Sequence, residues 1–334
     1  HIMKNIKLLS RENLLHNLSC FKHKKICAMV KSNAYGHGLK EIVKLVEDQV
    51  DYFGVAHIEE GVEVRKISDK PILVCSKISD FKKCKKHNLE VMVEDEVDIQ
   101  NCLNYGLKDA MHLKINCGMN RFGVGNVLYM GILNDLLEEK QINLRSIYTH
   151  FHCLEDKKQT FRDYKKFQML RAEILQNTTI CFGGSGIVNY PFEFGMVRLG
   201  IGLYGYGQKN LKPVMQISSY VSKVFYAKRG EYIGYGKKCK VRNGSYFAII
   251  PVGYGDGLRR NLSGDFKVLI NEKSYRSVAN ICMDAFFVKV DQNVKVGDKV
   301  VCMFDADYMA KKIDTIPYEI LTGFSNFRGN TLIL

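Results

Sequence analysis

A single lysine, Lys31, stands at the end of an apolar run and directly before a turn rich in glycine, asparagine and tyrosine. The apolar run over residues 26–30 should leave this lysine partly desolvated, which lowers the cost of losing its charge. A neutral lysine amine attacks aldehydes, and aldehyde capture by lysine is the chemistry of enzymes that use pyridoxal phosphate. Taken alone, a lysine at a strand end more often keeps its ammonium group in water beside apolar neighbours. The residues that follow the lysine decide between these two interpretations.

The segment around Lys31 is Val-Lys-Ser-Asn-Ala-Tyr-Gly-His-Gly, over residues 30–38. It resembles the cofactor-binding signature of the alanine racemases, in which Val-Lys is followed by a variable residue, by Asp or Asn, and then by Ala-Tyr-Gly-His-Gly. The resemblance implies that Lys31 carries pyridoxal 5'-phosphate covalently and that the Tyr35 hydroxyl holds its phosphate. Without the resemblance, Tyr35 would be interpreted as an aromatic residue of the core or its rim.

A second stretch, Met-Val-Arg-Leu-Gly-Ile-Gly-Leu-Tyr-Gly at residues 196–205, resembles the family's segment at the last barrel strand. By that match Arg198 faces the pyridine nitrogen, and the backbone amides of Gly200 and Ile201 bind the phosphate. Ser185, in the segment Gly-Gly-Ser-Gly at residues 183–186, stands where the family has a phosphate-binding serine. Backbone N–H groups in a glycine-rich turn suit phosphate because they direct positive dipoles at it. Arginine stays protonated and can only donate to the ring nitrogen. The cofactor is then a weaker electron sink, which suits an enzyme that must avoid decarboxylation and transamination.

The segment Gly-Tyr-Gly-Asp-Gly at residues 253–257 resembles the family's Gly-Tyr-x-Asp-Gly, in which the tyrosine is the second catalytic base. Racemisation at Cα needs a proton removed from one face and another delivered to the opposite face, so two acid-base groups must flank the carbon. By the match, Lys31 serves one face and Tyr254 the other. A free tyrosine has a pKa of about 10 and needs help to act as a base at neutral pH. The match gives that role to His150, hydrogen-bonded to the phenol and linked in turn to Arg198.

In the family this tyrosine reaches the lysine of a partner subunit, so the resemblance implies a homodimer with shared active sites. Met283, within Ile-Cys-Met-Asp, corresponds to a residue whose amide contacts the substrate carboxylate from the partner. Arg121 matches an arginine near the substrate carboxylate and the cofactor hydroxyl. Lys114 matches a lysine that is carbamylated in some members, a modification that would give an anion able to orient Arg121.

Two stretches depart from the family pattern. Asn116, Cys117 and Asn120 stand where members commonly have Asp, Thr and Gly, which leaves the carbamylation of Lys114 open. Near the C-terminus the family often has Ser-Tyr-Arg with a phosphate-binding tyrosine, whereas residues 325–328 are Ser-Asn-Phe-Arg. Asn326 or a neighbouring residue is the candidate to replace that tyrosine.

The elements that must position these residues can be predicted from apolar runs that recur through the first 205 residues, with amphipathic stretches between them. This alternation is typical of repeated β-α units with parallel strands. Eight repeats predict an α/β fold of the (β/α)8 TIM-barrel type, in which catalytic groups gather at the C-terminal ends of strands. The runs are 26–30, 52–57, 71–75, 91–94, 111–116, 147–151, 180–182 and 197–204, with helices expected at 39–50, 97–104, 131–140 and 159–176.

Beyond residue 207 the pattern changes to alternating segments separated by Gly, Asn and Asp, which indicates an antiparallel sheet or small barrel. We therefore expect a barrel at residues 3–207 that carries the lysine and an all-β domain at 212–334 that carries the tyrosine. The start of the chain is a candidate to join the second domain. The alternating segments are 214–226, 246–252, 266–270, 286–290 and 299–304.

Composition narrows the class of protein further. The net charge of the 334 residues is +14, but the lysines are spread along the chain, which favours a solvated basic surface over a nucleic-acid or membrane partner. The 11 cysteines stand singly without a Cys-x-x-Cys pair, so we expect free thiols and no metal site. Since the sequence shows no targeting segment and no apolar run of roughly 18 residues, we expect a cytoplasmic protein.

The resemblance thus implies an isomerase that interconverts L- and D-alanine with pyridoxal 5'-phosphate and supplies D-alanine for peptidoglycan. A racemase with broader specificity, acting on serine or other small amino acids, is one alternative. A barrel-type amino-acid decarboxylase is another, but it would need an acidic partner for the pyridine nitrogen and a catalytic cysteine, where this chain has Arg198 and Tyr254. A non-catalytic cofactor carrier is a third, and for it the second domain would be superfluous.

Overall fold

The computed structural model describes residues 3–334, and eight of its strands pair in parallel and close into a barrel. Most strand residues are buried, because the barrel interior covers one face of each strand and the helices cover the other. The predicted (β/α)8 barrel is therefore confirmed. Its strands are β2 (Lys25–Met29), β3 (Tyr52–Val55), β4 (Ile72–Val74), β5 (Glu90–Val93), β6 (Met111–Lys114), β7 (Ser146–His150), β8 (Thr179–Gly183) and β9 (Met196–Leu199).

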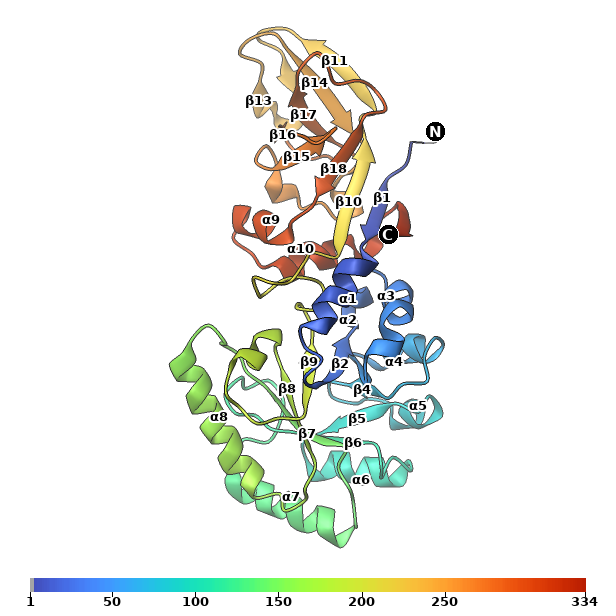
Figure 1. The fold of residues 1–334 in the computed structure, drawn as a ribbon, viewed down its shortest axis with the longest axis vertical. Helices are drawn as coiled ribbons and strands as arrows, with labels where there is room; N and C mark the ends of the chain where they lie inside the picture. Colours follow the sequence, from blue (N-terminus) through green and yellow to red (C-terminus); the bar gives the residue numbers. More distant parts are fainter. Residues whose placement is uncertain (1–2) are drawn as a thin grey trace.

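Helices surround this barrel (Figure 1). Three of them begin at polar caps: the side chains of Asp95, Asn126 and Asp156 each accept a hydrogen bond from the N–H group three residues later. The four predicted helices are confirmed, with ends displaced by up to four residues. The helices are α2 (Lys31–Tyr35), α3 (Leu39–Val46) with η1 (Glu47–Gln49), α4 (Ile58–Arg65), α5 (Phe81–Lys86), α6 (Glu96–Asn104), α7 (Val127–Glu139), α8 (Lys157–Ala172) and η2 (Ser185–Asn189).

The C-terminal part of the chain builds a nine-stranded sheet in the order β11-β14-β17-β16-β15-β18-β10-β1-β19. All of its pairings are antiparallel except that of β1 with β19, which confirms the predicted, mainly antiparallel arrangement. Its strands are β10 (Met215–Tyr220), β11 (Lys223–Ala227), β14 (Ser245–Ile250), β15 (Lys267–Ile270), β16 (Lys273–Val278), β17 (Phe286–Val290), β18 (Lys299–Met303), β19 (Asn330–Ile333) and β1 (Ile6–Leu9); β12 (Tyr232–Ile233) and β13 (Cys239–Lys240) form a separate ribbon.

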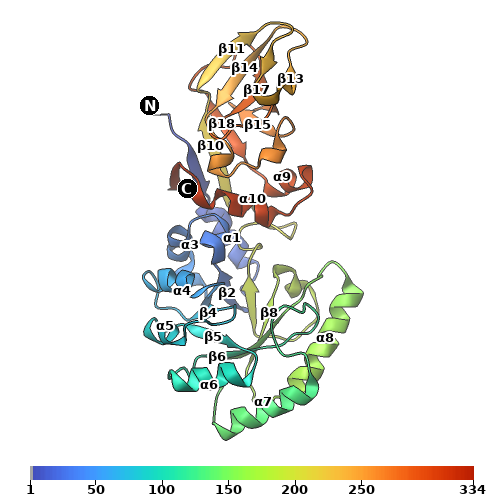
Figure 2. The ribbon, with the colours of Figure 1, turned by 180° about the vertical axis from the view of Figure 1, so that it is seen from behind.

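The first strand of the chain thus belongs to the last sheet. In β1, Ile6 lies opposite Ser218 of β10 on one side and opposite Asn330 of β19 on the other. The chain then enters α1 (Arg11–Ser19), capped by the Ser10 side chain, before it reaches the barrel. β1 and β10 run side by side above α1 at the junction of the two parts (Figures 1 and 2).

The expectation of an all-β second domain is wrong, because two helices follow β18. They are α9 (Ala306–Lys312), capped by the Asp305 side chain, and α10 (Pro317–Gly323), which has proline at its first position. α10 lies between the sheet and the barrel (Figure 2) and contacts α2, the element that begins with Lys31. Among residues 3–334, no helix is both long enough and apolar enough to cross a bilayer.

Candidate active site

Four basic side chains act electrostatically on one imidazole: Lys31, Lys114 and Arg198 lie at the C-terminal ends of barrel strands, and Arg121 lies in the loop after β6. His150 ends β7 and is largely buried, and its pKa is lowered from 6.5 to about 3. Burial is the main cause, followed by the positive charges of Arg198, Lys114, Arg121 and Lys31. The structure therefore brings five of the predicted site residues together, and it keeps His150 neutral at physiological pH.

The backbone directly after Lys31 is left-handed. Ser32, Asn33, Ala34 and Tyr35 all have φ of 52° to 53°, although none is glycine. A left-handed conformation costs roughly 1–2 kcal/mol for each such residue, so the surroundings must hold this turn in place. The Glu60 carboxylate accepts a hydrogen bond from the Ser32 N–H at 2.6 Å. The Asn33 side chain accepts one from the Leu39 N–H and donates one to the Ser325 carbonyl.

The turn directs Tyr35 into a closed cradle. Tyr35 is only 5% exposed, and its ring stacks on Tyr204 at 4.7 Å. A Cβ atom at Gly200 would lie 2.5 Å from the Tyr35 hydroxyl, so only glycine leaves this oxygen room there. Among the described residues the hydroxyl has no hydrogen-bond partner, whereas Ser185 Oγ accepts from Gly202 N–H at 2.9 Å. Burial raises the pKa of Tyr35, so the hydroxyl remains a donor, as a phosphate ligand requires.

Arg198 is buried, and its hydrogen-bond partners are neutral groups. Its guanidinium donates to the Thr149 carbonyl at 2.7 Å and to the Cys181 carbonyl and thiol, each at 3.3 Å. A side chain at Gly183 would overlap both Arg198 Nη2 and His150 Nδ1, so this glycine allows the two groups to approach each other. The hydrogen bond that the resemblance implies between His150 and Arg198 is not among the contacts of the described residues. Arg198 therefore stays charged and acts only as a donor.

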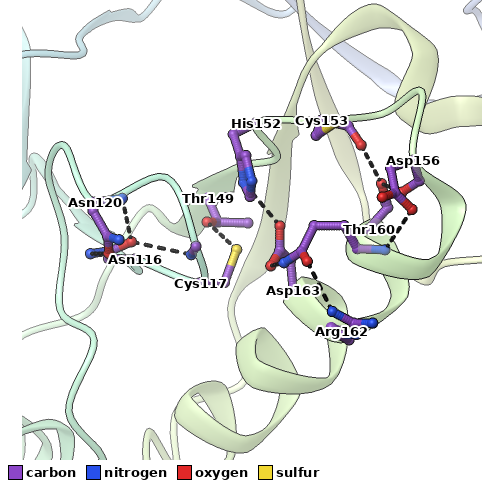
Figure 3. A network of polar contacts seen from close by, with 12 residues as sticks. Asn116, Cys117, Asn120, Thr149, His152, Cys153, Asp156, Thr160, Arg162 and Asp163 are labelled. Atoms are coloured by element: carbon purple, nitrogen blue, oxygen red, sulfur yellow. Dashed lines mark hydrogen bonds and ion pairs between the residues drawn. The ribbon is translucent and has the colours of Figure 1, made fainter.

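Polar contacts fix the end of β7 on both sides of His150 (Figure 3). Before it, the Thr149 hydroxyl donates to the Ile115 carbonyl at 2.7 Å and lies 3.1 Å from Cys117 Sγ. After it, His152 Nδ1 lies 3.1 Å from the carboxylate of the buried Asp163 in α8. Cys117, where the family commonly has threonine, thus still contacts a hydroxyl, and the strand end that carries His150 is held firmly.

Lys114 and Arg121 occupy the neighbouring strand and loop. Burial, reinforced by the charge of Arg198, lowers the pKa of Lys114 to about 7, and its Nζ lies 4.7 Å from the centre of the Tyr148 ring. Arg121 is exposed and lines a pocket of about 440 Å³. The Asn116 side chain accepts from two backbone N–H groups of the loop that leads to Arg121. At neutral pH a large fraction of Lys114 is the free amine, the form that carbamylation requires.

Tyr254 and Met283 lie on the C-terminal part of the chain, and both point into solvent, with exposed fractions of 42% and 54%. Their loops are joined: Tyr254 N–H donates to the Cys282 carbonyl at 3.1 Å, and the next N–H donates to the Met283 carbonyl at 2.9 Å. Arg328 bonds Asp256 in one loop and Asp284 in the other. No hydrogen bond or ring contact joins Tyr254 to the Lys31 cluster within residues 3–334.

Sequence reasoning missed Tyr318, near the start of α10. Its ring centre lies 5.8 Å from that of Tyr35. The residue as a whole is 40% exposed, but desolvation on its buried side raises the pKa of its hydroxyl. By contrast, Asn326, considered as a replacement for the absent tyrosine of the C-terminal segment, is exposed and makes no hydrogen bond with a described side chain. Pro317, at the first position of α10, was a sequence signal for this helix, since proline is typical of a helix start. The helix that begins there packs on the left-handed turn after Lys31.

His37 anchors the far end of the same turn and yields a prediction. It is fully buried, its ring lies 4.4 Å from Tyr204, and burial lowers its pKa to about 3. Because the unfolded state binds a proton near pH 6.5 and the folded state does not, the free energy of unfolding should fall as pH falls from about 6.5 toward about 3.

In His37→Gln the slope of this fall should decrease by up to about 1.4 kcal/mol per pH unit. Denaturant unfolding at several pH values measures the slope. His23→Gln, at an exposed histidine, is the control and should keep the wild-type slope. Equal slopes in His37→Gln and wild type would contradict the assignment of a neutral, buried His37.

Comparison with known proteins gives matches along the whole chain. The family model of the alanine racemase N-terminal domain matches residues 9–208, and that of the C-terminal domain matches residues 214–329. The alanine racemase of Vesicomyosocius okutanii is 31% identical over 343 residues, covering 97% of each chain.

Solved structures show the same fold. The alanine racemase of Clostridium difficile 630 superposes with a TM-score of 0.91 at 28% identity, covering 100% of this chain and 96% of that one. The alanine racemase of Bartonella henselae, solved with covalently bound pyridoxal phosphate, has a TM-score of 0.90 at 22% identity, with full coverage of both chains.

Proposed function

The chain belongs to the alanine racemase family, and from this we propose that it interconverts L- and D-alanine at pyridoxal 5'-phosphate, with Lys31 and the Tyr254 of a second subunit as bases. The observation that carries the proposal is the hydroxyl of the buried Tyr35 side chain: it makes no hydrogen bond with a described residue, faces Gly200 and follows Lys31 on one turn. The direct test is the loss of circular dichroism when purified protein and cofactor are given L-alanine. L-Serine in the same assay reports on substrate breadth.

The residues of the cradle fit the cofactor's groups. Lys31 would bind its aldehyde carbon, and Arg198 would donate to its ring nitrogen. When bound, the cofactor supplies an electron sink that acidifies the substrate's Cα–H bond. Its phosphate would be held by the side chains of Tyr35, Ser185 and Tyr318 and by the backbone amides of Gly200 and Ile201.

The positive charges around His150 also explain how a tyrosine could act as a base. A phenol that enters this cluster meets the positive charges of Arg198 and Arg121, which also depress the pKa of His150, and they favour the phenolate. His150 itself is neutral, so one ring nitrogen is free to accept a hydrogen bond from the Tyr254 hydroxyl. Lys31 and Tyr254 would then hold and deliver protons on opposite faces of Cα, while Arg121 and the Met283 amide would orient the substrate carboxylate.

Exposure of Tyr254 and Met283 supports a homodimer. Their loops form one bonded unit that projects from the C-terminal domain, and a second copy of the chain would place this unit over the Lys31 cluster. An isologous pair of chains fills both sites in this way. We propose that its product, D-alanine, supplies peptidoglycan synthesis.

Replacing Arg198 with Glu should change the reaction specificity. A carboxyl group can share a proton with the ring nitrogen, which strengthens the electron sink and favours transamination and decarboxylation. We expect racemisation to slow by at least about 10²-fold, and pyruvate released per racemisation turnover to rise by about the same factor. Arg198→Lys, which keeps the positive charge, is the control. Unchanged pyruvate release by a folded Arg198→Glu protein would contradict the proposed role.

A further inference from the structure

One buried cation near the active site has no part in the proposed reaction. Lys7, in the middle of β1, is only 4% exposed. Its Nζ donates to the Gly36 carbonyl at 2.6 Å and to the Phe324 carbonyl at 2.9 Å. One ammonium group thus joins the first strand of the chain, the turn after Lys31, and η6 (Phe324–Asn326) near the C-terminus.

Gly36 closes the left-handed turn, so the lysine acts where the strained backbone ends. The turn's own hydrogen bonds run from the N–H groups of residues 36, 37 and 38 back to the carbonyls of Ser32, Ala34 and Asn33. Side chains from α4 and α2 hold its beginning, through Glu60 and Asn33. At its end, His37 Nδ1 lies 3.1 Å from the carbonyls of Ala34 and Tyr35, and Lys7 fixes the carbonyl of Gly36. A hydrogen bond from a charged donor such as Lys7 is stronger than one from a neutral group.

The strand that carries Lys7 also contacts the segment before Tyr254. Asn5 Nδ2 donates to the Pro251 carbonyl at 2.6 Å, and Asn5 Oδ1 accepts from Ser219. The start of the chain therefore binds both the turn that holds Lys31 and the strand end that leads to Tyr254. The position of the Lys31 turn relative to the strand end that leads to Tyr254 therefore depends on the start of the chain.

We propose that Lys7 is a positioning residue: its ammonium group fixes the end of the left-handed turn and so holds Tyr35 against Gly200 in the geometry that binds the cofactor phosphate. This inference rests on the proposed cofactor role of Lys31 and Tyr35. It concerns a residue outside the reacting groups, because both hydrogen bonds of Lys7 go to backbone carbonyls, in the turn and in η6, and its Nζ also lies 5.9 Å from the centre of the Phe327 ring.

The charge of Lys7 is sensitive to mild alkali. Burial lowers its pKa to about 8, and the carboxylate of Glu41 in α3 partly opposes this shift. The other titratable group that faces it is His37, which is neutral. Above pH 8 the group becomes a neutral amine and holds the Gly36 carbonyl less strongly, so cofactor affinity should fall.

As pH rises above about 8, the free energy of unfolding should increase, whereas cofactor affinity should fall. Between about pH 8 and about pH 10.5 the unfolded chain still binds the Lys7 proton while the folded chain does not, so this group makes the free energy of unfolding rise with pH. A lysine that served only global stability would not lower cofactor affinity over that range.

The experiment compares Lys7→Met with the wild type and with Lys24→Met. Lys24 also donates to a backbone carbonyl, that of Phe194, but at the opposite end of the barrel strands. Two readouts are independent of catalysis: amide hydrogen exchange of the peptide covering residues 31–38 in the apoprotein, and the Kd for pyridoxal 5'-phosphate from fluorescence titration. Lys7→Met should speed exchange in this peptide and raise the Kd by about tenfold or more, and Lys24→Met should change neither.

If Lys7→Met keeps both the wild-type exchange rate and the wild-type Kd, the inference is overturned. If Lys7→Met does not fold, Lys7→Arg, which keeps its charge in alkali, replaces it: its Kd should stay constant from about pH 7 to about pH 9.5 while that of the wild type rises. Parallel curves for the two proteins would overturn the inference. A wild-type protein that does not bind the cofactor would instead refute the proposed function.

Discussion

Replacing Lys31 with alanine is expected to abolish racemisation, with a loss of at least about 10⁴-fold in the rate at which L-alanine loses its circular dichroism. The loss is large because the substitution removes two things at once, the covalent attachment of the cofactor and one of the two bases. The backbone of the left-handed turn should survive, since its hydrogen bonds involve residues 32 to 39 and not the Lys31 side chain.

Lys25→Ala is the matched control, because Lys25 is an exposed lysine at the opposite end of the same strand, β2. It should keep wild-type activity. An added small amine should restore part of the activity of Lys31→Ala, since the amine can take the place of the missing base. Steady rotation of L-alanine by Lys31→Ala without an added amine would refute the assignment of Lys31.

Tyr254→Phe should lower the racemisation rate by at least about 10²-fold while leaving the fold and cofactor binding intact, because only a solvent-exposed hydroxyl is removed. Exchange of the Cα hydrogen with deuterated water should persist for one enantiomer of alanine, the one whose hydrogen faces Lys31. Tyr246→Phe, at another exposed tyrosine of the same domain, is the control and should have no effect.

Mixing Lys31→Ala with Tyr254→Phe tests the shared site. In a mixed dimer, one site combines the intact Lys31 of one chain with the intact Tyr254 of the other, and the second site lacks both. Random exchange of subunits should therefore restore about one quarter of the wild-type sites. Activity after mixing that stays at the level of the separate variants would show that each chain uses its own tyrosine.

The barrel could be predicted because its signal is local. Each strand is a short apolar run, and each lies between polar segments that cap or cover it, so eight runs could be counted without knowing their partners. For the start of the chain we could predict only that it was a candidate to join the second domain. β1 itself could not be recognised in this way, since its four residues pair with strands more than 200 residues away. The helices α9 and α10 are seven residues each, too short for a clear periodic pattern among the alternating segments around them.

The residues of the candidate site also differ in whether their signal is local in the sequence. Lys31, Tyr35, Arg198 and Tyr254 lie in continuous motifs and could be proposed from the sequence. Tyr318 and Lys7 act through contacts between distant segments, Tyr318 through Tyr35 and Lys7 through Gly36. The left-handed conformation of residues 32–35 had no local signal, because none of the four is glycine; the surrounding hydrogen bonds impose it.

The position of β1 between β10 and β19 also bears on how the protein is made. The C-terminal domain is discontinuous in sequence: its first strand leaves the ribosome before the barrel, and one of its two neighbours, β19, is synthesised after the barrel and the other strands of the sheet. That strand must wait while some 300 residues are added, and only then can Ile6 pair with Asn330 and the Arg11 N–H donate to the Leu334 carbonyl. A fragment cut in the linker after residue 207 would separate Lys7 from Phe324 and leave β10 without one of its two partners, β1. The Lys31 turn is therefore joined to Phe324 through Lys7 only after the barrel and the C-terminal sheet have been synthesised.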